Sequence, residues 1–507
     1  MKPVLALTLQ TCREAIRSRL LLVLALVLSS AMLFLPSEGI GDGSAAGALK
    51  VRLEWSIGFS TVVASLAALW IGTLSITREV DGQQFHLLYV KPVGPSAYWG
   101  GRFLGACLVS FGLFLPAAGC TWWRLEYDRQ AQKQSALTQA AGVIREAEAL
   151  HKAGQLSPEG VTLLQSLSQA LPRFFKTPEE WRHFVDATPV ASGQAESWLT
   201  RLREATNRMH QMEVMEDTVY EARNFVEARP PAVAEIEQKE LERLTRERPG
   251  SAPSDLRDEA VKKAAQLTRS VAPGSSVVFT AENVPPGKDG EMFVRAKFWA
   301  ASLTGERLYV GLSMIDPATN ADTPILGWRG NGGEVLRFGI KPQCRGEDGR
   351  VRVRIHNLGP KGSSSFLVQL GDGPFILGQS QSFGLNFFLM TLAICGFLAI
   401  LAAAGCSFGL CFSTPVALFM SGAYLFLSQV LGAVANPDEG LNYQVLRLVT
   451  ATEGEFDLSS LLSRGQAIGS AELWPILLFG VLIKGGLLYL AGRIALQRRE
   501  FGKEARR

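Results

Sequence analysis

The pentapeptide GCSFG at Gly405–Gly409 has the G-x-S-x-G spacing that presents a nucleophilic serine on a tight turn in many hydrolases, with Ser407 in the nucleophile position. Such a serine needs a general base, usually histidine, within hydrogen-bond reach. The last histidine of the chain is His356, and none falls in an apolar stretch. We therefore interpret the pentapeptide as a small-residue turn between two membrane spans, not as an intramembrane protease site.

Other catalytic motifs are missing from the sequence. No H-E-x-x-H pair occurs and the five histidines are scattered, which argues against a zinc site. The P-loop pattern G-x-x-x-x-G-K-[ST] does not occur either, so energy from a nucleotide would have to come from another chain. We expect a protein that is not an enzyme, with no catalytic residue, no metal and no cofactor.

Two charged residues lie in or beside apolar stretches. Lys484 is in the middle of LWPILLFGVLIKGGLLYL. An intramembrane lysine often marks a functional site, but we interpret Lys484 as a lysine that pairs with a neighbouring helix or reaches toward the headgroups. Glu79 follows another apolar stretch, and we expect it to cap a helix or to pair with Arg78 or Lys91. The alternative for Glu79 is a solvated loop acid.

The elements that must position these residues are membrane helices. A bilayer core of about 30 Å requires roughly 20 apolar residues in a helix. Six segments meet or approach this length, and we predict a span at each: Leu20–Leu35, Ile57–Ile76, Phe103–Trp123, Phe387–Cys406, Pro415–Ala435 and Leu473–Leu490. The first has a basic front like a signal peptide. We expect it to be retained, because no small-residue cleavage site lies close behind it.

The residues before the first span show an amphipathic helical pattern. The apolar members are Leu5, Leu9, Cys12, Ile16 and Leu20, and the polar members are Gln10, Arg13, Glu14 and Arg17. We expect a helix that lies along the cytoplasmic membrane surface with its basic side near the headgroups. The alternative is a helix that extends the first span.

Lysine and arginine gather in three places: the N-terminal stretch, the polar segment Thr77–Arg102 between spans two and three, and the C-terminal tail. With six spans all three lie on the same side, and the opposite short loops carry fewer basic residues. The positive-inside rule then predicts that both termini and Thr77–Arg102 are cytoplasmic. The long polar middle of the chain is extracytoplasmic in this topology.

The polar middle has two textures. Residues 124–270 are rich in Ala, Glu, Gln, Arg and Leu and are expected to be helical, with breaks at GQLSPEG, KTPEE, RPPAVAE and RPGSAPSD. Residues 271–373 contain six short alternating or β-branched runs: SSVVFTAE, EMFVRAKFWA, RLYVGLSMI, EVLRFGI, GRVRVRIHNL and SSFLVQL. They predict an antiparallel β-sandwich. The fold class is thus an α-helical polytopic membrane protein of six spans (1–123 and 374–507) with an extracytoplasmic insert, helical and then all-β.

Four parts of the sequence carry a family resemblance. In the first, Glu79, Gly82, Leu87-Leu88, Lys91-Pro92-Val93, Tyr98 and Gly101-Arg102 are similar to the E-x-x-x-G…L-L-x-x-P-V…G-K run of type-2 ATP-binding-cassette (ABC) exporter permeases. The branch concerned includes the nitrous-oxide-reductase maturation and gliding-motility permeases. Here Gly82 follows Glu79 by three residues, and Arg102 stands where that branch often has lysine.

The other three parts lie at the ends of the chain. LALTLQTCREAIRSRLLLVLALVL resembles the family's N-terminal elbow helix and first span, and CFSTPVALFMSGAYLF resembles a later span. In LYLAGRIALQRREFG, the residues Arg498, Arg499, Glu500 and Phe501 resemble the terminal R-R-[DE]-F of the family. The resemblance covers the membrane half of the chain, and the large insert departs from the compact permeases.

The resemblance implies a role for Thr77–Arg102. In such permeases this segment includes a coupling helix that docks into a groove of a separate cytoplasmic ATPase, and six spans make half of a transporter. The resemblance therefore implies a protein of the inner membrane with two partners: a cytoplasmic ABC ATPase subunit and a second permease, either another copy or a related chain. The ATPase-coupling residues it indicates are Glu79, Gly82, Phe85, Leu87, Leu88, Tyr89 and Pro92.

A different class of function remains open. The insert suits a membrane-anchored scaffold or a force-transmitting protein whose extracytoplasmic part binds a cell-envelope partner. One span would suffice for an anchor, which counts against the pure form of this alternative. A net charge of +4 on 507 residues, with no basic tract interleaved with aromatics, gives no reason to expect a nucleic-acid partner.

Overall fold

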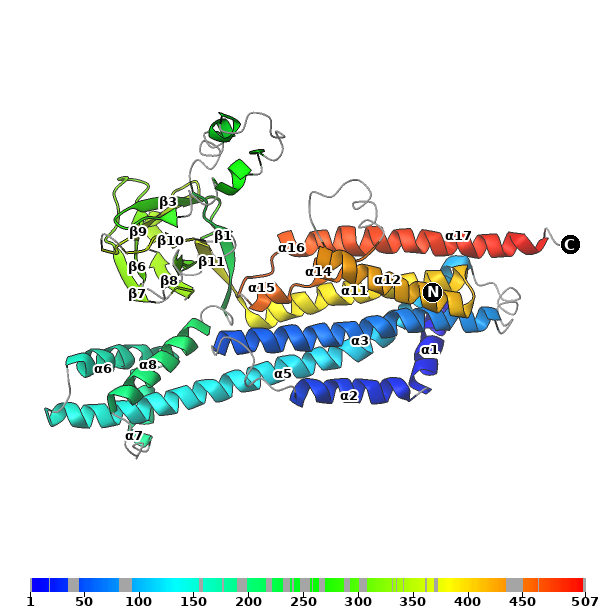
Figure 1. The fold of residues 1–507 in the computed structure, drawn as a ribbon. Coiled ribbons are helices and arrows are strands. Elements are labelled where there is room, and N and C mark those ends of the chain that lie inside the picture. Colours follow the sequence, from blue (N-terminus) through cyan, green and yellow to red (C-terminus); the bar gives the residue numbers. More distant parts are fainter. Residues whose placement is uncertain are drawn as a thin grey trace. The chain divides into compact units, whose positions relative to one another are not determined.

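The chain forms two compact units in the computed structural model (Figure 1): a helical unit, Met1–Glu221 with Ser382–Arg507, and a β unit, Ala222–Gln381. The β unit is thus inserted into the sequence of the helical unit. The structure describes residues 2–17, 19–34, 45–81, 94–154, 158–175, 177–188, 198–215, 221–230, 238, 241–246, 256–257, 259–263, 270–286, 292–300, 308–330, 332–333, 335–340, 342–360, 363–368, 373–434, 450–463 and 465–504.

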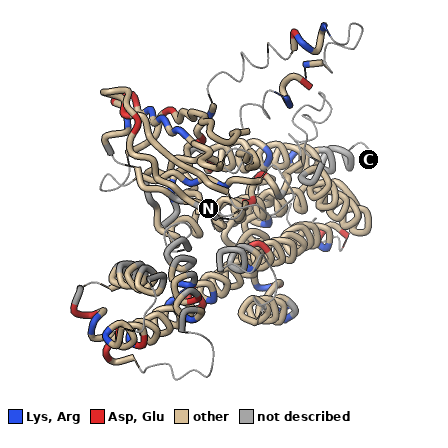
Figure 2. The backbone as a smooth tube through the Cα atoms, turned by 60° about the vertical axis from the view of Figure 1, so that its left-hand side comes forward, with Lys and Arg blue, Asp and Glu red and all other residues tan. Residues whose placement is uncertain are grey.

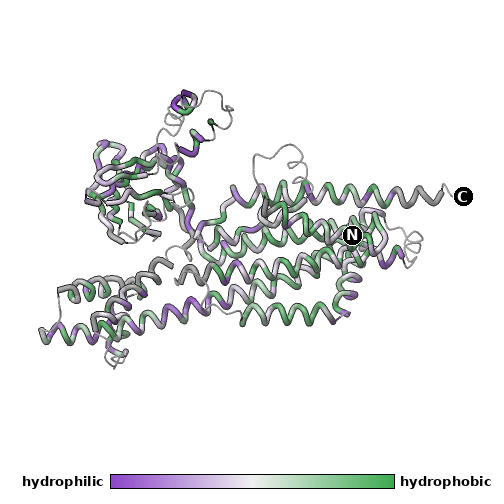
Figure 3. The backbone as a smooth tube through the Cα atoms, viewed as in Figure 1, coloured by the Kyte–Doolittle hydropathy of each residue, from purple (hydrophilic) through white to green (hydrophobic). Residues whose placement is uncertain are grey.

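Five helices in the described part of the chain are long and apolar enough to cross a membrane. They are α3 (Ala45–Asp81), α5 (Pro95–Lys152), α11 (Phe383–Cys411), α12 (Thr414–Val434) and a last helix made of α16 (Ser470–Pro475), the π-helix η5 (Ile476–Lys484) and α17 (Gly485–Glu504). Hydrophobic residues dominate these helices (Figure 3), and charged residues are sparse along their apolar stretches (Figure 2). This architecture is that of a membrane-spanning protein.

The N-terminal helices form a bent pair. α1 (Lys2–Arg17) and α2 (Leu20–Phe34) meet at 71°, and the pair counts as a sixth span only if both helices are taken together. Arg19 at the bend has a positive φ of 53°, a left-handed conformation that interrupts a helix. α1 is therefore not a straight extension of α2.

α3, α5 and α11 run side by side in the helical unit, and α2, α12 and α17 pack against them. The contact between α3 and α11 is made by small residues. A Cβ atom on Gly405 would lie 2.6 Å from the carbonyl oxygen of Leu69, and one on Gly409 would lie 2.8 Å from that of Thr73. Glycine at both positions allows the two backbones to approach closely.

This contact corrects the interpretation of GCSFG as a turn. The pentapeptide lies inside α11, and the chain turns only at Phe412 and Ser413, before α12. Ser407 is buried, and its hydroxyl donates to the carbonyl oxygens of Ala403 (2.9 Å) and Leu488 (2.7 Å). The small residues are needed because two helices cross there, not because the chain reverses.

α5 continues for 58 residues, from the apolar region into the polar middle of the chain. Three further α-helices and a short 3₁₀-helix pack around its second half: α6 (Pro158–Ala170), η1 (Leu171–Phe174), α7 (Pro178–Ala187) and α8 (Trp198–Met215). Buried alanines such as Ala140 and Ala147 of α5 allow this close packing. Pro158 and Pro178 stand at helix starts, as the sequence predicts, and the hydroxyl of Thr177 caps α7.

The β unit contains three antiparallel sheets. Their strand orders are β1-β11-β4-β8, β2-β10-β5 and β3-β9-β6-β7. The strands are β1 (Glu221–Glu227), β2 (Ser270–Val271), β3 (Ser276–Ala281), β4 (Met292–Lys297), β5 (Trp299–Ala300), β6 (Leu308–Ile315), β7 (Leu326–Gly330), β8 (Val335–Ile340), β9 (Val351–Asn357), β10 (Phe366–Leu367) and β11 (Phe375–Ser382). Alternate residues of β3, β4, β6 and β9 enter one shared hydrophobic core.

All six sequence runs expected to form strands do so, but the boundaries of the β unit differ from 271–373. The unit also includes β1, from a stretch expected to be helical, and β11 continues to Ser382. The composition of EARNFVE favours a helix, whereas its pairing with β11 and the packing of Val226 and Ala228 against the core favour a strand. Tertiary contacts override local propensity here.

Candidate functional site: a buried arginine at the base of segment 82–93

Only part of the predicted coupling segment is described. Of the indicated coupling residues, Glu79 is described, and Gly82, Phe85, Leu87, Leu88, Tyr89 and Pro92 lie outside the described residues. The two ends of Thr77–Arg102 are helical, because α3 continues to Asp81 and α5 begins at Pro95. The segment that joins the two helices is therefore shorter than the polar stretch suggests.

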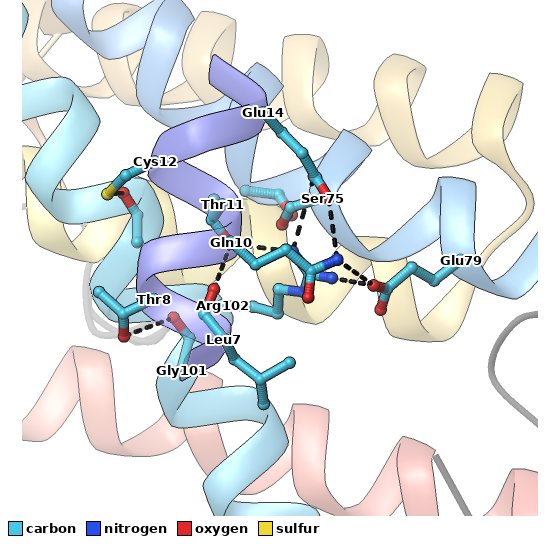
Figure 4. Close-up of polar contacts among 12 residues, drawn as sticks. Leu7, Thr8, Gln10, Thr11, Cys12, Glu14, Ser75, Glu79, Gly101 and Arg102 are labelled. Carbon is cyan, nitrogen blue, oxygen red and sulfur yellow. Dashed lines mark hydrogen bonds and ion pairs between the residues drawn. The ribbon is translucent and has the colours of Figure 1, made fainter. Parts of the chain in front are cut away.

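An arginine lies at the base of this segment. Arg102 of α5 has an exposed side-chain fraction of 0% and forms an ion pair with Glu79 of α3, which is 13% exposed. The hydroxyl of Tyr98 donates to the other carboxylate oxygen of Glu79 at 2.7 Å (Figure 4 shows the surroundings of the ion pair). Glu79 is thus held by two residues of α5 rather than by Arg78, and it is not a solvated loop acid.

The N-terminal helix α1 completes the network. Arg102 donates to the hydroxyl of Thr11 at 2.9 Å, and its guanidinium lies 3.7 Å from a carboxylate oxygen of Glu14. Gln10 donates to Glu14 at 2.9 Å and to Glu79 at 3.5 Å. A single buried cation therefore joins α1, α3 and α5 (Figure 4).

α1 approaches α5 closely beside Arg102. A Cβ atom on Gly101 would lie 2.6 Å from the Cβ of Leu7, and one on Gly105 would lie 2.5 Å from the Cβ of Thr11. Gly101 and Gly105 form a G-x-x-x-G pair, which brings one side of α5 against a neighbouring helix. This spacing is a signal in the sequence from which the contact could have been predicted.

The contact also changes the interpretation of α1. The buried side of α1 consists of Leu7, Thr8, Thr11 and Ala15, whereas the apolar residues Leu5, Leu9 and Ile16 are exposed. The helix therefore has three sides: one against the protein, one apolar and uncovered, and one with the charged residues. The amphipathic pattern identified the uncovered apolar side, not the side that packs.

The energetics of the network make it a rigid connection. A buried arginine is tolerated when carboxylates and hydrogen-bond acceptors surround it, and loss of one partner leaves a charge buried without compensation. The planar guanidinium can satisfy several acceptors at once, which a lysine ammonium does less well. The network thus fixes the ends of α3 and α5 relative to each other at the point where segment 82–93 leaves them.

Lys484, the lysine in the middle of an apolar stretch, is also buried. It is the last residue of η5, and it forms an ion pair with Glu455 and donates to the carbonyl oxygen of Thr450 at 3.0 Å. Its ammonium is thus paired inside the helical unit. No cluster of three His, Cys, Asp or Glu side chains that could hold a metal occurs among the described residues.

Comparison of the chain with protein-family models, with curated proteins and with solved structures finds no match. The residues and their geometry therefore carry the functional argument.

Proposed function

We propose that this protein is the permease subunit of an ABC transport system of the exporter type, with ATP hydrolysis on a separate cytoplasmic subunit. The observation that supports this most is the buried network of Arg102, Glu79 and Tyr98 at the base of segment 82–93. A docking segment that receives force from a partner requires a rigid connection to the helices behind it. The ion pair supplies that connection, and α1 is tied to it through Thr11.

In this proposal the ATPase binds segment 82–93 through Phe85, Leu87, Leu88 and Tyr89. Movement of the ATPase on binding ATP is passed to α3 and α5 together, because Glu79 and Arg102 hold their ends as one body. Two such subunits, identical or related, form the complete transporter. The resemblance to type-2 ABC exporter permeases points to the same arrangement.

Exposed tryptophans near the ends of the apolar stretches of three helices fit membrane interfaces there, although Trp70 in the middle of α3 is exposed as well, and the orientation rests on the positive-inside rule. Trp55, Trp123 and Trp474 are each more than half exposed. On α5, Trp123 follows Arg102 by about 30 Å along the helix, at a rise of 1.5 Å per residue. Tryptophans are enriched at membrane interfaces. We therefore assign Trp123 to the outer interface and Arg102 to the inner one, with α1 along the inner surface and α2 as the first span.

Co-purification tests the proposal. Tagged protein extracted in mild detergent should bring down a polypeptide with a P-loop, and the complex should hydrolyse ATP. Recovery of the intact permease with no nucleotide-binding polypeptide, under conditions that preserve other membrane complexes, would contradict the assignment.

A force-transmitting scaffold is the second candidate, and the connections of the insert favour it. α5 is one continuous helix from the apolar region into the polar middle, and α11 begins at Phe383, directly after β11 ends at Ser382. We propose the β unit as a sandwich on the outer side that contacts a cell-envelope partner. Deletion of residues 124–373 separates the two functions: a transporter keeps its ATPase partner, whereas a scaffold loses its envelope partner and its function.

A further inference from the structure

Lys484 and Glu455 belong to two elements that are unusual inside an apolar helix bundle. Lys484 ends η5, a π-helix of nine residues, whereas π-helices are rare and mostly single turns found at functional sites. Glu455 lies in α14 (Glu453–Phe456), a short helix between α12 and the last apolar helix. The Lys484 side chain is 7% exposed and that of Glu455 is 20% exposed.

The segment that carries Glu455 packs into the helical unit, with Ala451, Phe456, Leu458 and Leu462 buried and Gly454 and Asp457 exposed. Between Thr450 and Ile468 the chain forms α14 and α15 (Ser459–Ser463), which pack against α3, α11, α12 and η5. Ala451 is fully buried, and its backbone N–H donates to the hydroxyl of Tyr424 at 3.1 Å. The hydroxyl of Ser428 donates to the carbonyl oxygen of the same residue. The segment is thus an irregular stretch of chain held inside the bundle by polar contacts.

Phe456, next to Glu455, fits against the π-helix. A Cβ atom on Gly480 would lie 2.6 Å from the ring of Phe456, and one on Gly396 would lie 2.8 Å from Val481. Gly480 of η5 therefore leaves room for the ring of Phe456. Gly396 of α11 likewise leaves room for Val481 of η5. The ion pair and the ring together fix the buried segment to η5.

From this geometry we propose that Lys484 and Glu455 form a latch. The latch holds segment 450–468 inside the bundle and keeps η5 in its π conformation. Separation of the two charges releases the segment and allows η5 to rewind toward an α-helix, which turns α17. The latch depends only on contacts within the helical unit and not on the identity of a partner.

α17 extends from the latch to the start of α5. Its Tyr489 donates to the hydroxyl of Ser96 at 2.9 Å, and a Cβ atom on its Gly492 would lie 2.8 Å from the indole nitrogen of Trp99. Rotation of α17 would therefore act on the residues beside segment 82–93. This last link rests on the proposed coupling role of that segment, whereas the latch does not.

Two single-cysteine proteins test the latch. In the full-length chain with its native cysteines replaced, one protein carries Ala451→Cys in the buried segment and the other retains only Cys406, which is buried in α11. Each is purified in detergent, and the rate of reaction with a small thiol reagent is measured on the monodisperse fraction. Lys484→Met and Glu455→Gln should each raise the rate at position 451 about tenfold or more, because loss of one partner leaves the other charge buried. The rate at Cys406 should change little.

A double variant and a surface control complete the experiment. Lys484→Met with Glu455→Gln should raise the rate at position 451 no more than the larger of the two single changes does, because the two residues act as one contact. Arg493→Met removes an exposed positive charge from α17 and should leave both rates unchanged. The latch is refuted if the single variants leave position 451 protected, if the rates at position 451 and at Cys406 rise equally, or if the effects of the two changes on the rate at position 451 multiply in the double variant.

Discussion

Arg102 is the residue on which the connection between the helices depends. It has no exposed surface, and its partners come from α1 and α3. The guanidinium bonds to Thr11 and Glu79 through different nitrogen atoms. The contact therefore depends on the planar shape of the guanidinium as well as on its charge.

Arg102→Met should destabilise the helical unit by roughly 3–5 kcal/mol, because Glu79 is left buried without its cation. Adding Glu79→Gln to the same chain should recover part of that loss, since the uncompensated charge is then gone. Thermal unfolding of the purified single and double variants in detergent measures the coupling between the two residues. Additive effects of the two changes would show that the ion pair is not a unit.

His356 of β9 gives the β unit a dependence on pH. Burial lowers the pKa of His356 below its ordinary value; Arg354 acts in the same direction and Asp322 opposes it. The folded state therefore takes up a proton less readily than the unfolded chain. The stability is complete above a pH of about 6.5 and falls as the pH drops through the lowered pKa of the folded state.

Hydrogen–deuterium exchange in peptides from β3, β6 and β9 should therefore be faster at pH 5.5 than at pH 7.5, after correction for the intrinsic rate. The hydroxyl of Ser313 lies 2.8 Å from Nε2 of His356. His356→Gln should remove most of the pH difference, because glutamine can still bond to Ser313 and does not titrate. His183→Gln, an exposed change on α7, serves as the control. An equal pH effect in the His356→Gln protein would exclude His356 as its source.

At the scale of elements, glycines decide how closely the helices approach. Gly405→Ala places a Cβ atom 2.6 Å from a backbone oxygen of α3, which cannot move without shifting the helix. We expect a loss of about 1–3 kcal/mol in stability. Gly422→Ala in α12 is the matched control, because a Cβ atom there meets nothing within 4 Å. It should be neutral or stabilise by up to about 1 kcal/mol.

Thermal unfolding of both glycine variants, under the same detergent conditions, gives the comparison. The control is needed because alanine favours a helix over glycine at either position. Equal stability of the two variants would mean that α3 and α11 do not meet at Gly405 as the structure has them.

The sequence predicts best those helices and strands whose residue pattern lies within the element itself. A long apolar run predicts a helix wherever it packs, and the alternation in GRVRVRIHNL predicts β9 because one side of the strand enters the core. β1 was missed because its pairing with β11 lies far away in the sequence. The face of α1 that packs was missed because Leu7 and Thr11 lie where Gly101 and Gly105 of α5 leave room for them, and that contact does not show in the sequence of α1 itself.

The site was predicted in part for the same reason. Glu79 was recognised as a charged residue beside an apolar helix, but its partners Tyr98, Arg102 and Gln10 are brought together only when three helices cross. Lys484 was expected to be paired, and the identity of Glu455 depends on how segment 450–468 folds back into the bundle. Composition indicates that a buried charge needs a partner, and only the packing of the helices says which partner it is.

At the scale of the whole molecule, the proposed topology makes a prediction about access. In intact cells that express a cysteine-free background, Ser251→Cys should react with a membrane-impermeant thiol reagent, because the proposed topology places the insert outside the cytoplasm. Gly94→Cys and Lys503→Cys should react only after the cells are permeabilised. Reaction of the tail position in intact cells would reverse the proposed orientation.

A double substitution tests the proposed docking of segment 82–93 on an ATPase most directly. Leu87→Asp with Leu88→Asp puts two charges where the proposal buries two leucines, each of which contributes roughly 1.5–3 kcal/mol when fully buried. Ile325→Asp with Leu326→Asp, at two exposed apolar residues of the β unit, is the matched control. The affinity of each purified protein for the ATPase is measured under identical conditions.

The Leu87/Leu88 variant should insert and be as stable as the original protein but bind the ATPase at least about a hundredfold more weakly, since every 1.4 kcal/mol changes affinity about tenfold. The Ile325/Leu326 control should bind normally. A stable Leu87/Leu88 variant that binds the ATPase with unchanged affinity would contradict the coupling role of the segment and, with it, the proposed function of the protein.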